Sequence, residues 1–130
     1  MLTPLFSYMI TTFTSEIKDM GTRRVVRALD LVDDEESIAA YRRWHEPGAV
    51  WSEVTAYIRA TGVVSMEIWG VGNRLFMILE VLDDFPRPVP EPARVREWEQ
   101  LMSGFQRPLP QASPDAKWTE LDCVFRLRDP

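Results

Sequence analysis

The chain has 130 residues, of which 45% are apolar and 27% are charged, and this size and composition are typical of one globular domain with a single core. Its net charge of −5 argues against nonspecific binding to nucleic acid or to an anionic membrane, since both depend on clustered lysines and arginines. A neutral ligand suits this charge better. A single cysteine cannot close a disulfide within the chain, so we expect a cytoplasmic protein.

The N-terminal residues 1–22 are predicted to be an extension ahead of a domain that covers residues 23–130. The first 20 residues have no clean helical or strand period, and Met20 stands directly before the first strand-like run, as a start codon would. The apolar residues at 1–9 lack a preceding basic residue and fall well short of the ~20 residues that span a bilayer, which predicts neither a signal peptide nor a membrane helix. The extension is either dispensable or a short element packed on the domain.

A strand and a helix open the domain. Residues 23–31 place β-branched and aliphatic side chains between charged ones, which is typical of a strand. Residues 33–45 predict a short helix, because acidic residues at its start are favoured by the helix dipole. Within it, Ile38, Tyr41 and His45 recur at helical spacing.

A second helix and two strands follow. Pro47 and Gly48 interrupt the helical pattern, and residues 50–61 predict a second helical stretch that completes the crossover. Residues 63–69 and 74–82 predict two strands joined by a turn rich in glycine and asparagine, so we expect them to pair antiparallel. The second of these strands is apolar on both alternating faces, which predicts a central strand with a layer on each face of the sheet.

The C-terminal third predicts one helix and one strand separated by proline-rich loops. Prolines punctuate residues 85–91, which indicates an exposed connection. Residues 92–105 then carry apolar side chains three or four positions apart, as in an amphipathic helix. Residues 121–127 alternate between apolar and polar side chains, the period of a half-buried strand, and Cys123 is expected to be an inert thiol on its apolar face.

The resulting order of strand, helix, strand, strand, helix, strand predicts an α+β fold, a ferredoxin-like β-α-β-β-α-β sandwich. A subunit of this kind has an exposed sheet face to cover. Two copies packed face to face would form a dimeric α+β barrel, so we predict a homodimer.

Several strong catalytic motifs are missing from the sequence. It contains no phosphate-binding glycine loop, no CxxC and no HExxH, and one histidine cannot build a multi-histidine metal site. No recognisable elbow surrounds a serine or cysteine nucleophile either. The functions that remain are noncovalent acid/base catalysis and simple ligand binding, and we expect neither to use a metal ion.

Two features of the chain are candidates for a binding site. Tyr41 and His45 are four residues apart, so a helix would place the phenol and the imidazole on one face, although His45 would equally interact with the helix C-terminus. Trp69, at a strand end, and Trp98, on the last predicted helix, are candidates for walls that stack on a sugar, and core filling explains either one as well.

Five fragments, in their order and spacing, resemble the L-rhamnose and L-fucose mutarotase family from about residue 23 to residue 127. The C-terminal pieces at 105–108 (FQRP) and 117–118 (KW) are similar to the fucose-type branch in particular. The five fragments are YRRWH at 41–45, WSEV at 51–54, MEIW at 66–69, RLFM at 74–77 and VREWE at 95–99.

The resemblance implies a cofactor-free isomerase that interconverts the α and β anomers of a 6-deoxy-L-hexose, L-fucose or L-rhamnose, and works as a homodimer. His45 would be the acid/base residue, with an imidazole near its ordinary pKa of ~6.5. Tyr41 would hydrogen-bond the substrate and Trp98 would form a wall of the pocket. Glu99 stands where the rhamnose-type pattern has a second aromatic residue, and it is a candidate for binding a sugar hydroxyl.

Two other functions remain open at this point. The same architecture hosts unrelated sites, among them those of small monooxygenases that are cofactor-free or haem-dependent. A noncatalytic module would keep the fold and the pocket, and would bind a sugar without accelerating anomer exchange.

Overall fold

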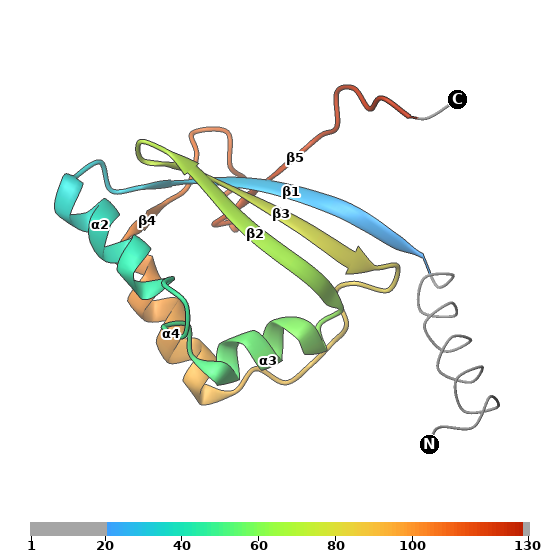
Figure 1. Cartoon of the computed structure of the whole chain (residues 1–130), viewed down its shortest axis with the longest axis horizontal. Helices are drawn as coiled ribbons and strands as arrows, with labels where there is room; N and C mark the ends of the chain where they lie inside the picture. The colour runs from blue at the N-terminus through green and yellow to red at the C-terminus, as the bar shows by residue number, and fades with distance from the viewer. Residues whose placement is uncertain (1–20, 129–130) are drawn as a thin grey trace, which may run out of the picture.

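The structure is a computed structural model that describes residues 21–128, and its elements follow the predicted order (Figure 1). The ferredoxin-like α+β fold is therefore confirmed, with one added two-residue strand that the sequence did not predict. The elements are β1 (Thr22–Leu31), α2 (Glu35–Trp44), α3 (Ser52–Ala60), β2 (Val63–Val71), β3 (Arg74–Leu82), α4 (Ala93–Ser103), β4 (Gln106–Arg107) and β5 (Thr119–Leu121).

The strands form one antiparallel sheet in the order β2-β3-β1-β4, and β5 pairs with β1 on the same edge as β4. β3 lies between β2 and β1, as its apolar pattern predicted. It pairs with β1 along its whole length, from Thr22 opposite Leu82 to Asp30 opposite Arg74. This long pairing fixes which side chains share each face of the sheet.

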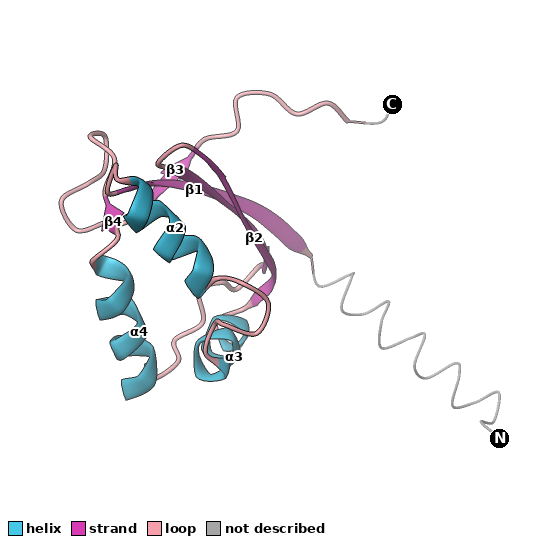
Figure 2. Cartoon of the chain, turned by 60° about the vertical axis from the view of Figure 1, so that its left-hand side comes forward, coloured by secondary structure: helices cyan, strands magenta, loops and turns pink. Residues whose placement is uncertain are grey.

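The three helices of residues 21–128 cover the same face of the sheet (Figures 1 and 2). The core lies between these two layers, and β3 contributes alternate residues to it: Leu75, Met77, Leu79 and Val81. No described residue forms a layer on the opposite face, where Phe76 and Ile78 stay partly exposed. The prediction of two covering layers is therefore wrong for the single chain, because both crossovers return on the same side of the sheet.

Local capping explains where α2 begins. The side chain of Asp34 accepts a hydrogen bond from the backbone N–H of Ser37 at 3.0 Å, and Glu35 and Glu36 occupy the first turn. Both interactions stabilise a helix N-terminus. The other end closes at His45, whose backbone N–H reaches the carbonyl oxygens of the last turn. The helix therefore ends on His45, the predicted acid/base residue.

The last strand is much shorter than predicted. β5 ends at Leu121, and every residue of 122–128 is exposed, including Cys123. The prediction of a half-buried strand over 121–127 and of a buried thiol is therefore wrong for this structure. Alternation in a sequence shows which side chains are apolar, but it does not show that a surface of the same chain covers them.

Two further expectations concern the ends of the chain and the membrane. Nearly all of the predicted extension, residues 1–20, lies outside the described residues. Within residues 21–128, no helix has both the length and the apolar character needed to cross a membrane.

Candidate functional site

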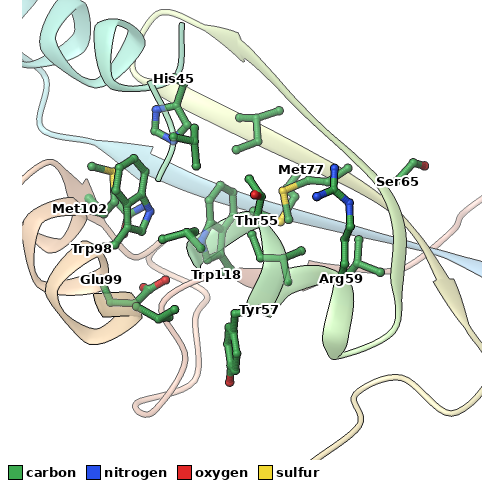
Figure 3. A pocket seen from close by; sticks show the side chains of 18 of the residues that line it. His45, Thr55, Tyr57, Arg59, Ser65, Met77, Trp98, Glu99, Met102 and Trp118 are labelled. Carbon is green, nitrogen blue, oxygen red and sulfur yellow. The ribbon is translucent and has the colours of Figure 1, made fainter. Parts of the chain in front are cut away.

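A cavity of about 350 Å³ lies between the helices and the sheet. This volume is within the range of small-molecule sites, about 300–1,000 Å³. His45, Trp98 and Glu99 lie at one end, Arg59 and Ser65 at the other, and Trp118 between them (Figure 3). The middle of the wall is mostly apolar and includes Val54, Ile58, Met66, Ile68 and Met77.

The His45 side chain is fixed by a hydrogen bond to its own helix. Its Nδ1 lies 2.7 Å from the carbonyl oxygen of Tyr41, and because a carbonyl only accepts, the proton of the neutral ring belongs on Nδ1. Nε2 is then unprotonated and can accept a proton from a ligand. Both interpretations of His45 are therefore compatible, since the ring binds the helix C-terminus through one nitrogen and also lines the cavity.

Burial lowers the pKa of the His45 imidazole below 6.5, and the hydrogen bond to the Tyr41 carbonyl only partly opposes this effect. Burial disfavours the charged imidazolium because it removes water from around the ring. The sequence-based expectation of an unperturbed pKa is therefore corrected. At neutral pH the ring is uncharged and ready to act as a base.

Tyr41 lies beside this imidazole, with the two ring centroids 4.2 Å apart. The residue is only 3% exposed. Burial raises the pKa of the phenol to about 12, and the negative charge of Glu99 adds to the rise, while a hydrogen bond with the Gln106 side chain opposes it. The phenol is therefore neutral throughout the physiological range and keeps a proton to donate.

Trp98 also packs against the imidazole. Its ring lies edge-on to His45, with a centroid distance of 5.7 Å, and also contacts the rings of Trp44 and Trp51 at 6.0 and 5.1 Å. Perpendicular aromatic pairs of this kind are favourable. Because Trp98 is 5% exposed and also lines the cavity, it fills the core and forms part of the wall.

Glu99 lies at the mouth of the cavity. Its Oε2 is 3.6 Å from Nζ of Lys117, and the side chain is 56% exposed. An exposed pair of this kind contributes little to stability. The carboxylate therefore remains available to a ligand hydroxyl.

Trp69 does not join the other four predicted residues. It lies opposite Phe76 in the sheet, on the face turned away from the helices, and is 60% exposed. Its neighbours Met66 and Ile68 line the cavity instead. Side chains alternate along a strand, so a tryptophan at a strand end has to be assigned to a face before it can be assigned to a pocket.

Two polar or aromatic wall residues were not predicted. Gln106 of β4 is 8% exposed and lines the cavity, and Trp118 lies in the wall after the second proline-rich loop. Both belong to the fragments that resemble the fucose-type branch, which was the available signal. Their side-chain chemistry alone gave no reason to place either one in the cavity wall.

Among residues 21–128, no group of three or more histidine, cysteine, aspartate and glutamate side chains is arranged to hold a metal ion.

Comparisons with known proteins give concordant matches. A family model described as L-rhamnose mutarotase matches residues 24–127. An L-fucose mutarotase from Xanthomonas campestris pv. campestris is 39% identical over 89 residues, which are 64% of this chain and 70% of that protein. A UPF0734 protein from Dictyostelium discoideum is 34% identical over 82 residues, covering 58% of this chain and 64% of the relative.

A solved structure supports the same fold. The crystal structure of an L-rhamnose mutarotase from Formosa agariphila matches with a TM-score of 0.60 at 22% sequence identity. The match covers 82% of this chain and 99% of that one. At this identity the likeness concerns the fold alone.

Proposed function

Because the chain belongs to the L-rhamnose mutarotase family, we propose that it is an isomerase that interconverts the α and β anomers of a 6-deoxy-L-hexose. The observation that carries the proposal is the pairing of a neutral imidazole with a neutral phenol on one wall of a sugar-sized cavity. We further propose that the reaction needs no cofactor and that it takes place in the cytoplasm.

The two side chains can divide the proton transfers of ring opening. Nε2 of His45 accepts the proton of the anomeric hydroxyl, the C1–O5 bond breaks, and its electron pair moves onto O5 while C1 becomes an aldehyde. O5 takes the proton of the Tyr41 phenol, because the alkoxide that forms is more basic than a phenolate. Rotation about C1–C2 exposes the other face of the aldehyde, and the reverse transfers close the ring and restore both side chains.

The rest of the wall suits a deoxy sugar. Beyond His45, the apolar side chains of Val54, Ile58 and Met77 match a methyl group better than a hydroxymethyl group, which would leave a hydroxyl unsatisfied there. The half-buried ring of Trp118 offers a flat surface for the C–H face of the pyranose. We propose L-fucose over L-rhamnose as the preferred sugar, supported by the 39% identical relative and by Glu99 at the mouth.

NMR exchange spectroscopy tests this function directly. The exchange between α and β anomers of L-fucose and of L-rhamnose is measured with and without the protein. We expect both rates to rise and that of L-fucose to rise more. Sugar binding without acceleration would instead identify a noncatalytic binding module, and no effect on either sugar would reject the proposal.

The lowered pKa of His45 predicts a specific pH profile. A base works only when it is unprotonated, and a pKa below 6.5 keeps the imidazole unprotonated to more acidic pH. We therefore expect kcat/KM, after subtraction of the uncatalysed rate, to fall on acidification with a midpoint below pH 6.5. A fall centred above pH 6.5 would contradict the role of a buried neutral imidazole.

We also propose that the chain is a homodimer in which two outer sheet faces pack together. Cross-strand pairing puts an apolar band on that face. Ion pairs flank the band at both ends, Arg24 with Glu80 at 3.1 Å and Asp30 with Arg74 at 2.8 Å. An apolar centre with a polar rim is the usual anatomy of a protein interface. The band consists of Val26, Trp69, Phe76, Ile78 and Leu121.

The C-terminal segment supports the same proposal. Val124, Phe125 and Leu127 are 98%, 78% and 86% exposed, and they follow directly after Leu121 of the band. Exposed apolar patches of this extent mark interaction surfaces. A second copy would cover the band and these side chains together, and would supply the second layer that the pattern of β3 predicted.

A further inference from the structure

Lys117 joins the loop between β4 and β5, residues 108–118, to α4 through a small polar network. Its Nζ donates a hydrogen bond to Oγ of Ser103 at 2.8 Å and lies 3.6 Å from Oε2 of Glu99. The Ser103 hydroxyl donates its own proton to the backbone carbonyl oxygen of Glu99 at 2.7 Å, which leaves its lone pairs for the ammonium. Because Glu99 and Ser103 are four residues apart on α4, Lys117 binds both on one face of the helix.

This network fixes a residue of the cavity wall from outside the cavity. Among the described residues that line the cavity, Glu99 is the only carboxylate, whereas Lys117 and Ser103 do not line it. The side chains of Lys117 and Glu99 are 32% and 56% exposed, so their ion pair contributes little to the stability of the fold. The main effect of the pair is therefore on the direction in which the carboxylate points.

We propose that Lys117 is a positioning residue, which holds the Glu99 carboxylate in place for a sugar hydroxyl and thereby sets the preference for L-fucose over L-rhamnose. This inference rests on the proposed function. The two sugars differ in configuration at C2 and C4, so an acceptor fixed at one point of the cavity meets hydroxyls that they direct differently. Without Lys117, the carboxylate loses rotational freedom when it binds, which weakens binding, and it can follow a hydroxyl of either configuration.

The substitution Lys117→Met tests this role, because methionine keeps much of the length of the side chain and removes the ammonium. We expect KM for L-fucose to rise about two- to tenfold, the usual effect of having to order one long side chain on binding. KM for L-rhamnose should change less, so that the preference for L-fucose falls. Because the contact is the same in the ground state and the transition state, kcat should change little, and so should the midpoint of thermal unfolding.

Three further variants separate positioning from a merely structural role. Lys117→Arg restores a cation that can reach both acceptors and should recover most of the preference. Arg43→Met removes an exposed cation of α2 that does not line the cavity, and this matched control should retain KM for both sugars. In a Glu99→Gln background there is no carboxylate to hold, so Lys117→Met should cause no further loss of preference.

The proposal is overturned if Lys117→Met retains the wild-type KM for L-fucose, or if KM rises equally for both sugars. It is also overturned if the loss of preference persists in Glu99→Gln or comes with a lower midpoint of thermal unfolding. A wild-type protein that accelerates both sugars without preferring L-fucose would reject this inference and leave the mutarotase function in place. A wild-type protein that accelerates neither sugar would reject the mutarotase function itself.

Discussion

Replacing His45 with alanine should reduce the protein's acceleration of L-fucose anomer exchange by about a hundred- to ten-thousand-fold, the usual contribution of a positioned general acid or base. The imidazole is the only side chain in the cavity wall that is neutral, basic and locked in one tautomer near pH 7. Without it, water has to take the proton from the anomeric hydroxyl. NMR exchange spectroscopy at pH 7 measures this loss.

The variant also needs a structural control, because Nδ1 of His45 bonds the Tyr41 carbonyl at the end of α2. Glu46→Ala changes the next, exposed residue and should retain full activity. Circular dichroism should show that His45→Ala remains folded. If folded His45→Ala accelerates exchange as well as the wild type, the protein is a mutarotase by another mechanism, with the base located elsewhere in the cavity.

The separation of Trp69 from Trp98 shows where sequence reasoning succeeded and where it failed. Helical spacing correctly predicted that Tyr41 and His45 lie side by side, because residues four positions apart on a helix share a face. Trp98 also lay on the predicted apolar face of its helix. For Trp69 the face depended on strand register, which the pairing of Trp69 with Phe76 decides and which a local pattern does not contain.

Gln106 was not predicted for a related reason. It lies just after the end of α4, in a strand of only two residues, so no period marked it as inward-facing. Its burial follows from the pairing of β4 with the C-terminal end of β1, a contact between residues 75 positions apart in the chain. Local patterns were thus sufficient to predict the order of helices and strands. The residues that line the cavity depend on long-range strand pairing, which local patterns do not contain.

The failed prediction of a long final strand has a different cause. Residues 121–127 do alternate as a strand does, yet only the first of them lies in β5, and the apolar side chains beyond it stay largely exposed. Folding within one chain gives no reason for such a pattern. Burial against the proposed second copy would explain it, and the outer sheet face next to Leu121 is the surface with matching apolar character.

Replacing Trp69 with aspartate should therefore convert a dimer into a monomer. Trp69 is the largest aromatic residue of the band, and a large aromatic residue buried in an interface can contribute at least about 2 kcal/mol, so the dissociation constant should rise at least about 30-fold. The buried charge adds to this effect, and symmetry places it in the interface twice. Sedimentation equilibrium over a range of concentrations measures the change, with Ala56→Asp, exposed on the helical layer, as the control that should remain dimeric.

The same variant tests whether the site is complete within one chain. Tyr41 and His45, which carry the proposed proton transfers, belong to α2 and its C-cap on the helix side of the sheet, so the Trp69→Asp monomer should keep its mutarotase rate per chain within a few-fold. A monomeric wild type, or a Trp69→Asp variant as dimeric as the wild type, would exclude the outer sheet face as the interface. An inactive but folded monomer would show that the partner subunit orders the cavity through the sheet. β2 and β3 make this possible, because they carry Met66 and Met77 on the cavity face and Trp69 and Phe76 on the outer face.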